Sequence, residues 1–298
     1  MCAHIIRWPL YLLALTLHLS VSAQQTSEYE RQTEQWHAGR IRELKADNGW
    51  LNLAGLIWLD DGPNSFGSGS LNKLVFPSGK IPLKAGVLKR KGDAVTMTAA
   101  KKVKILVDGN PARNAVVLHP DSSVAAMMAY GDLRWNIIKR QDKLGVRLRD
   151  LQHPNLIDFK GVERFPVDTS WRKEAVLITD MYTRNIAITN MLGQTNMLSS
   201  PGKLRFRIDG RYHTLDALEE GDELFIIFGD ETSGLETYSS GRFIYAKKPG
   251  ADGRTILDFN RAINPPCAFT TFATCPLPPK QNILPMAVRA GEKNHHYD

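Results

Sequence analysis

The sequence lacks most features that place a chain in a special structural class. Of its 298 residues only 3 are cysteine, and its 23 glycines and 16 prolines are close to average frequency. It has no charged block and no low-complexity tract, which excludes a disordered, collagen-like or coiled-coil chain. With 43% hydrophobic and 23% charged residues, the composition is that of a globular protein of one or two domains with a sizeable core.

Motifs of the common hydrolases are also missing. There is no Gly-x-Ser-x-Gly elbow, no His-Glu-x-x-His pattern and no phosphate-cradling glycine loop, which disfavours a serine hydrolase or a zinc peptidase. No cofactor and no metal site are expected. The basic residues are dispersed, and the one tight cluster, at residues 101–104, is interpreted as a solvated strand or turn face, so nucleic acid is not expected as a partner.

One apolar stretch lies at the N-terminus. In Met1–Ala23, Arg7 supplies a basic first region, Trp8–Val21 is largely apolar, and Val21-Ser22-Ala23 is a small-residue cleavage pattern, as in a secretory signal peptide. The run is shorter than the ~20 apolar residues of a spanning helix, and no cysteine follows it, which disfavours a lipoprotein. We therefore expect an exported protein, periplasmic or secreted, with no stable membrane span after cleavage.

Cleavage after residue 23 changes the charge and the cysteine count. Loss of Arg7 and Cys2 leaves 37 of the 38 Lys and Arg against 31 Asp and Glu, a net charge of +6, and two cysteines. A mildly basic exported chain favours anionic ligands or an anionic envelope surface.

Segment lengths predict a mainly β protein. Ser27-Glu28-Tyr29-Glu30 has the spacing of a capping box, and helix-forming residues continue to about Asp47, with Trp36, Ile41 and Leu44 as candidate buried contacts. After Asn48-Gly49 the apolar runs become too short for alternating strands and helices. The predicted strands are Leu51–Leu59, Lys73–Phe76, Ala94–Met97, Val103–Val107, Ala115–Leu118, Arg134–Arg140, Val146–Leu148, Ala175–Ile178, Leu204–Ile208, Tyr212–Leu215, Glu223–Phe228, Arg242–Ala246 and Thr255–Phe259.

We predict four parts: a signal peptide (1–23), an N-terminal amphipathic helix (24–47), a sandwich-like β unit (48–123) and a larger antiparallel β sheet or barrel (124–298) on which the sandwich packs. The segment 58–68 resembles the first hairpin of a forkhead-associated (FHA) sandwich. Phosphothreonine recognition in that family needs an Arg soon after the Gly, whereas Gly67 is followed by Ser68-Gly69-Ser70. The resemblance therefore implies the sandwich without phosphopeptide recognition.

Three segments concentrate polar residues. In the first, Arg147 and Arg149 project from one face of a strand and could clamp a carboxylate or phosphate, or could be a solvated face with surface ion pairs. The second runs from Phe228 to Phe243 between two apolar strands and is either a polar binding rim or an internal hydrogen-bond network. In the third, at 257–269, Asp258 and Asn260 share one side of an extended segment.

The longer motifs resemble the domain of unknown function 1684 family, a bacterial and archaeal group with no established activity. The resemblance covers most of the predicted mature chain and is carried by the segments 49–51, 55–56, 58–59, 66–68, 147–150, 165–167, 230–234, 237–238, 241–242, 258–262 and 264–268. It implies a site formed by shared polar residues without naming a substrate. Those residues are Asp230, Thr232, Tyr238, Arg242, Asp258, Asn260, Arg261 and Asn264.

Cys267 and Cys275 lie close together in a Pro-rich stretch. In an oxidising compartment an intramolecular disulfide is the leading interpretation. Two alternatives stay open: a reduced nucleophilic Cys267 whose pKa Arg261 could depress, and a metal site, for which the neighbourhood lacks further ligands.

We therefore expect a small polar or anionic molecule to bind in an Asp/Arg/Asn/Tyr-lined pocket, and we leave the oligomeric state open. As a carboxylate-dependent hydrolase, the chain would use Asp230 or Asp258 as general base, with Tyr238 as a further catalytic candidate. The ligand-binding candidates are Arg147, Arg149, Thr232, Arg242, Asn260, Arg261 and Asn264. The alternative is a structural or protein-interaction module whose polar motifs are internal hydrogen-bond networks.

Overall fold

A computed structural model of the chain describes residues 28–122, 124–179 and 184–295, which form two compact units. We call Glu43–Gly161 with Pro266–Thr274 the sandwich unit. Residues 28–42, Val162–Pro265 and 275–295 form the barrel unit. The predicted signal peptide, Met1–Ala23, lies outside the described residues.

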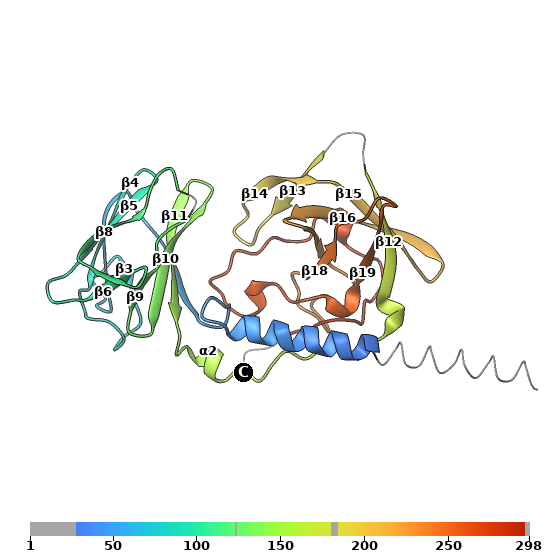
Figure 1. The fold of residues 1–298 in the computed structure, drawn as a ribbon, viewed down its shortest axis with the longest axis horizontal. Coiled ribbons are helices and arrows are strands. Elements are labelled where there is room, and N and C mark those ends of the chain that lie inside the picture. The colour runs from blue at the N-terminus through green and yellow to red at the C-terminus, as the bar shows by residue number, and fades with distance from the viewer. Residues whose placement is uncertain (1–27, 123, 180–183, 296–298) are drawn as a thin grey trace, which may run out of the picture. The chain divides into compact units, whose positions relative to one another are not determined.

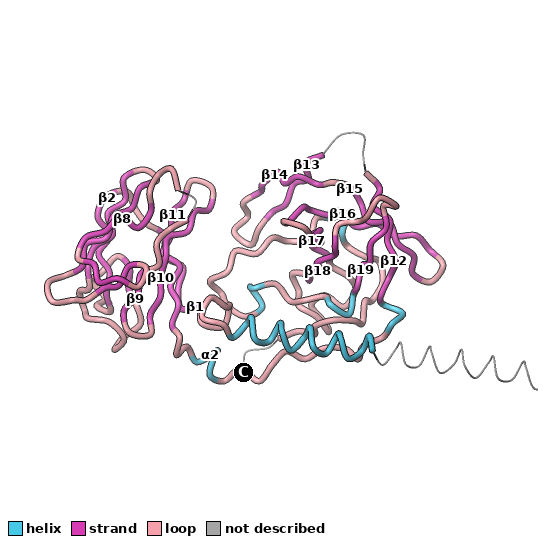
Figure 2. Tube along the Cα trace, viewed as in Figure 1, coloured by secondary structure: helices cyan, strands magenta, loops and turns pink. Residues whose placement is uncertain are grey.

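The predicted N-terminal helix is confirmed and spans residues 28–45. It is amphipathic, because Thr33 and Leu44 are fully buried while most of its other positions are exposed or half-buried. The helix ends before Gly49, where a Cβ atom would overlap the carbonyl oxygens of Glu43 and Leu44. In the part of the chain that the structure describes, helices are few apart from this one, and strands and loops predominate (Figure 2).

The sandwich unit consists of two sheets with a common core. One has the order β1-β11-β10-β9-β6-β7 and the other β3-β2-β4-β5-β8. Several of these strands are labelled in Figure 1, among them β10 and β11 of the first sheet and β4, β5 and β8 of the second. Trp135, Phe66 and Phe76 meet in the core with ring centroids 5.3–5.7 Å apart. The strands are β1 (Leu53–Trp58), β2 (Gly62–Gly67), β3 (Leu74–Val75), β4 (Gly86–Lys91), β5 (Ala94–Ala99), β6 (Ile105–Val107), β7 (Asn110–Ala112), β8 (Asn114–Leu118), β9 (Met128–Tyr130), β10 (Leu133–Arg140) and β11 (Lys143–Asp150), and the short helix α2 (Pro154–Ile157) follows.

This unit extends further along the chain than the predicted boundary at residue 123. β9, β10 and β11 lie beyond that residue, yet β11 pairs with β1 in one sheet, and Leu148 stands opposite Gly55. The turn-rich segment near Asp121 therefore connects two strands of the same unit instead of separating two domains.

The barrel unit is built on a six-stranded antiparallel sheet in the order β18-β17-β16-β15-β12-β19. Its end strands approach each other, because Thr255 of β19 donates a hydrogen bond to the Lys247 carbonyl of β18 at 2.7 Å, and the barrel is nearly closed. The strands are β12 (Arg172–Ile178), β13 (Arg184–Thr189), β14 (Thr195–Ser200), β15 (Gly202–Ile208), β16 (Arg211–Glu220), β17 (Glu223–Phe228), β18 (Arg242–Lys247) and β19 (Arg254–Asp258). β13 and β14 form a separate hairpin, and the 3₁₀ turns of the chain are η1 (Thr169–Trp171), η2 (Phe259–Arg261), η3 (Pro266–Ala268) and η4 (Lys280–Asn282).

Local turn chemistry sets the register of the β15–β16 hairpin. Asp209 and Gly210 both have positive φ, 46° and 79°, and connect the paired residues Ile208 and Arg211. Two positive φ angles are what a tight hairpin turn requires, and an Asp-Gly pair adopts them at little cost. Alternation from this turn directs Ile208, Phe206 and Leu204 into the barrel core. The mainly β fold class, with an N-terminal helix and a sandwich-like unit, is confirmed.

Candidate functional site

A buried ion pair joins two of the predicted site residues, Asp230 and Arg242. Asp230 follows β17 and Arg242 begins β18, and these strands pair so that Phe228 stands opposite Arg242. Arg242 Nη2 donates to Asp230 Oδ2 at 2.9 Å, and the exposure of both side chains is 0%.

The other oxygen of Asp230 is occupied as well. Oδ1 accepts the backbone N–H and the hydroxyl of Thr232, at 2.8 and 2.6 Å, and the N–H of Val288 at 3.1 Å. Together with Arg242, these four donors use the hydrogen-bonding capacity of a carboxylate. Because the side chain is fully buried among these donors, Asp230 is not placed to accept a proton from a substrate, and the second polar segment forms an internal network.

Arg242 also holds the C-terminal segment. Its Nη2 donates to the Val288 carbonyl at 2.8 Å, and its Nη1 donates to the carbonyl of Ala290. A fully buried guanidinium with a carboxylate and two carbonyl partners ties the strand ends to residues 288–290. These contacts give Arg242 a structural role.

Asn264, another predicted ligand-binding residue, is fully buried beside Glu292. Its backbone N–H donates to Glu292 Oε2 at 2.6 Å, and its side-chain amide donates to the Lys293 carbonyl at 2.7 Å. Burial raises the pKa of Glu292, and the nearby Arg40, whose Nε lies 3.4 Å from Glu292 Oε1, partly opposes that effect. These contacts, like those of Asp230, lie inside the barrel unit.

Asp258, Asn260 and Arg261 form a second cluster, which is closer to the surface. Asp258 ends β19, and its Oδ1 accepts the backbone N–H of Asn260 at 3.1 Å as the side-chain cap of the η2 turn. Arg261 Nε lies 3.4 Å from Asp258 Oδ2, and 35% of the Arg261 side chain is exposed. The Asn260 side chain is fixed to the backbone of Asp168, with the Asp168 N–H donating at 3.0 Å and the Asp168 carbonyl accepting at 2.8 Å.

Tyr29, from the helix of residues 28–45, completes this cluster. Its hydroxyl lies 2.8 and 3.0 Å from the two oxygens of Asp258 and 3.0 Å from Asn260 Nδ2. Burial and the negative charge of Asp258 raise the pKa of Tyr29 to about 12, so the phenol stays protonated at neutral pH. Tyr29 therefore donates to Asp258 and accepts from Asn260.

Two guanidinium groups flank the tyrosine and the carboxylate, each against an aromatic ring. Arg172 stands opposite Asp258 in the β12–β19 ladder, and its Cζ lies 5.7 Å from the centre of the Tyr29 ring. Arg261 Cζ lies 5.7 Å from the ring centre of Trp36, which is about two turns beyond Tyr29 on the same face of the helix. We name Tyr29, Trp36, Arg172, Asp258, Asn260 and Arg261 the Tyr29–Asp258 site.

This site carries two guanidinium groups and one carboxylate. Arg172 is exposed and forms no ion pair within the described part of the chain. Asp258 already accepts from Tyr29 and Asn260, so it neutralises Arg261 only in part. The arrangement leaves guanidinium N–H donors for an anion, and the aromatic rings limit the conformations of both arginines.

Tyr238 is half-buried, and burial raises the pKa of its hydroxyl while a hydrogen bond with Ser240 opposes the shift. No contact of Tyr238 with Asp230 or Asp258 is found among the described residues. Its neighbour Thr237 belongs to the buried network, with its hydroxyl 2.8 Å from that of Thr232. A tyrosine does meet the third polar segment, but it is Tyr29.

Arg147 and Arg149 belong to the sandwich unit. As predicted, they share one face of a strand, β11, while Val146 and Leu148 are fully buried on the other. Arg149 donates to Asn52 Oδ1 at 2.7 Å and to the Gly49 carbonyl, and burial lowers its pKa to about 10.

Arg147 lies with its Cζ 5.4 Å from the ring centre of Trp50, and burial lowers its pKa. Because the Arg149 guanidinium already binds Asn52 and the Gly49 carbonyl, the pair does not present two free guanidinium groups to one ligand.

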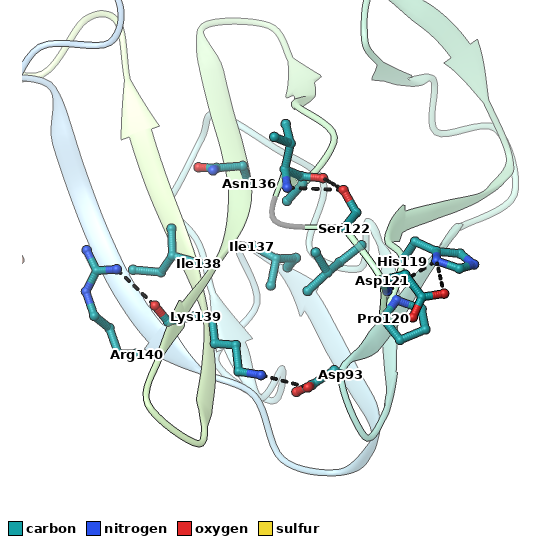
Figure 3. Close-up of a pocket in the computed structure, with 13 residues that line it drawn as sticks. Asp93, His119, Pro120, Asp121, Ser122, Asn136, Ile137, Ile138, Lys139 and Arg140 are labelled. Atoms are coloured by element: carbon teal, nitrogen blue, oxygen red, sulfur yellow. Dashed lines mark hydrogen bonds and ion pairs between the residues drawn. The ribbon is translucent and has the colours of Figure 1, made fainter. Parts of the chain in front are cut away.

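A cavity of about 640 Å³ lies elsewhere in the sandwich unit, around Leu118 and the strand residues Ile137 and Ile138 (Figure 3). Lys139 and Asp93 reach toward each other at this cavity and form an ion pair of 2.7 Å. None of the predicted site residues lines it. Because Asp93 is already paired with Lys139, the cavity offers less chemistry than the Tyr29–Asp258 site.

Two further observations limit the chemistry of the described residues. In the ranges 28–122, 124–179 and 184–295, no group of three or more His, Cys, Asp and Glu side chains is placed to hold a metal ion. None of the helices in these ranges combines the length and the apolar composition that a membrane crossing requires. Cys267 and Cys275 are disulfide-bonded, which confirms the leading interpretation and leaves no free thiol at Cys267.

Sequence reasoning missed Tyr29, Trp36 and Arg172 as site residues. Trp36 was predicted only as a buried helix contact, and Tyr29 only as part of a capping box. Arg172 lies just before the predicted strand Ala175–Ile178 and belongs to none of the polar segments noted in the sequence. Each of them meets Asp258 or Arg261 across more than 80 residues of the chain. Only the pairing of Arg172 with Asp258 could have been anticipated, and only if the sheet order were known.

Comparison with known proteins identifies the family. The family model "Protein of unknown function (DUF1684)" matches residues 157–293. A solution NMR structure of an uncharacterized protein from Haloarcula marismortui shares 32% sequence identity and covers 46% of this chain and 78% of its own, with a TM-score of 0.39. The chain belongs to the DUF1684 family.

Two solved FHA domains are also similar to part of this DUF1684 protein. One, from a study of phosphothreonine-dependent FHA domain interactions, shares 13% identity and covers 33% of this chain and 95% of its own, with a TM-score of 0.23. The other, the FhaA FHA domain complexed with the intracellular domain of Rv3910, shares 12% identity and covers 32% and 97%, also with a TM-score of 0.23. Among proteins with curated descriptions, none matches the chain.

Proposed function

We propose that this DUF1684 protein is an exported binding protein that takes a small anion, such as a carboxylate or phosphate, at the Tyr29–Asp258 site. The observation that carries the proposal is the placement of two arginines, each against an aromatic ring, next to a carboxylate that other donors already occupy. An anion bound there would receive bidentate hydrogen bonds from Arg172 and Arg261.

Binding without turnover fits this geometry better than hydrolysis. Asp230 is fully buried among four hydrogen-bond donors, and Asp258 accepts from Tyr29, whose high pKa keeps the proton on the phenol. A general base needs a lone pair within hydrogen-bond reach of the substrate's proton. A carboxylate-dependent hydrolase therefore has less support than a binding protein.

The experiment is a thermal-shift titration with inorganic phosphate and with succinate, against potassium chloride at equal ionic strength. A ligand that binds the folded state raises the melting temperature in proportion to its occupancy. We expect a rise for the wild-type protein that is lost in Arg172→Gln and in Arg261→Gln. Arg254→Gln is the matched control, because Arg254 is an exposed arginine of the same sheet that pairs with Glu174.

The competing explanation is that the cluster is purely structural. It predicts that Arg172→Gln and Arg261→Gln lower the melting temperature without ligand and that neither anion stabilises the wild-type protein. An anion-dependent rise that all three variants retain would mean that a different part of the surface binds.

Export is part of the same proposal. It is supported by the signal-like segment Met1–Ala23 and is compatible with the disulfide of Cys267 and Cys275. Expression of the full chain in a bacterial host, followed by cell fractionation and mass spectrometry, tests it. We expect a periplasmic or secreted product that begins at Gln24, whereas an uncleaved chain in the cytosolic fraction would contradict export.

A further inference from the structure

A separate part of the barrel sheet presents unpaired positive charge to solvent. β15 alternates Leu204, Phe206 and Ile208, which are buried in the barrel core, with Lys203, Arg205 and Arg207. Alternation therefore places the three cations on the outer face of the sheet. Strand β15 itself lies between β12 and β16 (Figure 1).

Tyr212 of β16 lies against two of these cations. It is 69% exposed, stands opposite Arg207, and has Arg205 Cζ 5.3 Å and Arg207 Cζ 5.9 Å from its ring centre. A tyrosine between two guanidinium groups restricts both side chains while their N–H donors stay in water. The ring therefore packs against the two surface arginines and takes no part in the barrel core.

The positive charge of the face is not neutralised. Within the described residues, Lys203, Arg205 and Arg207 form no ion pair. Carboxylates on the two neighbouring strands already have partners. Asp216 of β16 stands opposite Lys203 but pairs with Arg184, and Glu174 of β12 pairs with Arg254 of β19. An anionic partner would therefore find three cations without an internal competitor.

Aliphatic side chains accompany the cations. Ile178 stands opposite Lys203 and is 38% exposed, and Ile256, opposite Glu174, is 36% exposed. Phosphate at the boundary of an apolar layer matches this combination, since arginine binds phosphate in a bidentate manner and tyrosine favours the membrane–water interface. A hydrated acidic polymer would leave the two isoleucines without a partner.

We propose that the outer face formed by Lys203, Arg205, Arg207 and Tyr212, with Ile178 and Ile256 beside them, docks on a surface of anionic phospholipid. The contact is peripheral: the cations bind lipid phosphates and the aliphatic side chains enter the headgroup layer. This surface is distinct from the Tyr29–Asp258 site and does not depend on its occupancy.

The experiment is co-sedimentation of the protein with vesicles of phosphatidylglycerol and phosphatidylcholine in equal parts, compared with vesicles of phosphatidylcholine alone. We expect binding to the anionic vesicles only, and loss of binding as sodium chloride is raised to about 0.5 M. The variant Arg205→Gln/Arg207→Gln should lower the vesicle partition coefficient roughly tenfold or more.

Lys101→Gln/Lys104→Gln is the matched control, because it removes the same net charge from two exposed lysines of the sandwich unit. We expect it to bind as the wild type does. Equal losses in the two double variants would overturn the proposal, because they would mean that net charge, and not this face, attracts the vesicles.

A further variant separates a membrane from a soluble acidic polymer. Ile178→Ser/Ile256→Ser should weaken binding to the anionic vesicles and leave retention on immobilised dextran sulfate unchanged. If it leaves vesicle binding intact, or if the protein binds dextran sulfate but not the vesicles, the face recognises a soluble polyanion and the lipid assignment is wrong. The melting temperature of each variant, measured alongside, ensures that folded proteins are compared.

Discussion

Arg242 and Asp230 form an ion pair in which neither side chain is exposed, with Nη2 and Oδ2 2.9 Å apart. Arg242 also binds the carbonyls of Val288 and Ala290, so one guanidinium connects the β17–β18 strand ends to the C-terminal segment. Taking two charges out of water is costly, and the pair is stable only because every acceptor and most donors are satisfied. The pair is therefore most sensitive to the loss of one partner.

The first prediction concerns that loss. Arg242→Met should lower the free energy of unfolding by about 3–5 kcal/mol, because Asp230 stays buried without its counter-charge. The double variant Asp230→Asn/Arg242→Met should lose less than the sum of the single variants, since it no longer buries an unpaired charge. Urea denaturation of the four proteins measures both effects.

Arg254→Gln is the control for that experiment, because Arg254 and Glu174 form an ion pair whose side chains are both 57% exposed. Exposed pairs contribute about 1 kcal/mol or less. A cost for Arg242→Met no larger than that of the control would contradict the structural role of the buried pair.

Much of the fold could be predicted because its local signals agree. Short alternating runs, such as Leu204–Ile208 and Glu223–Phe228, become β15 and β17, and Asp-Gly pairs mark tight turns. β2 (Gly62–Gly67) is absent from the strands predicted by alternation, because its Gly, Pro, Asn and Ser are typical of turns, and only the FHA resemblance placed a hairpin at 58–68. Its Phe66 is nevertheless fully buried, so packing in the sandwich core overrides the local preference.

Less of the site could be predicted, because side-chain chemistry depends on which groups meet. Asp230 and Asp258 look alike in sequence, each a carboxylate at a strand end among polar residues. Burial and an arginine partner make the first a saturated internal pair, whereas the second lies under Tyr29 near the surface. Which arginine joins which carboxylate is decided by the sheet order, and strand composition does not encode that order.

The second prediction concerns the disulfide of Cys267 and Cys275. Replacement of both cysteines by serine should lower the free energy of unfolding by roughly 2–3 kcal/mol, the value that the chain-entropy model gives for so short a loop. Urea denaturation compares the double variant with the wild-type protein, and the wild-type protein under dithiothreitol is the control. Alkylation of both thiols in the native protein without reductant would contradict the bond.

The third prediction is a pH dependence that arises from His37. Burial lowers its pKa below the ordinary 6.5, Arg164 and Arg40 lower it further, and Glu34 opposes them. Its Nε2 is buried without a hydrogen-bond partner in the described structure. A histidine whose pKa is depressed in the folded state stabilises the fold above about pH 6.5, and this contribution is lost as the pH falls through the folded-state pKa.

Chemical denaturation between pH 8 and pH 5, on the wild-type protein and on His37→Gln, tests the effect. The difference in unfolding free energy between the two proteins removes the contribution of all other titrating groups. We expect the wild-type protein to lose stability relative to the variant as the solution becomes acidic. A difference that stays constant across this range would mean that His37 takes up its proton equally in the folded and unfolded chains.

The fourth prediction compares two glycines with positive φ. Gly241 (φ 83°) precedes Arg242, and a Cβ there would lie 2.5 Å from both the Phe228 carbonyl oxygen and Pro278 Cγ. Gly221 (φ 59°), in the turn between β16 and β17, would place a Cβ in open space. Alanine at Gly221 should lower the free energy of unfolding only by the left-handed backbone strain, about 1–2 kcal/mol. Alanine at Gly241 adds a steric overlap, which should lower it by about 1–3 kcal/mol more.

The same overlap has a local consequence, which distinguishes it from general destabilisation. To relieve it, the chain at Gly241 must move away from the end of β17, and Arg242, the next residue, must move with it. Gly241→Ala should therefore also weaken the Asp230–Arg242 pair, so that adding Arg242→Met to it costs less than Arg242→Met costs in the wild-type background. In the Gly221→Ala background the cost of Arg242→Met should be unchanged, and equal costs in both backgrounds would show that Gly241 does not position the arginine.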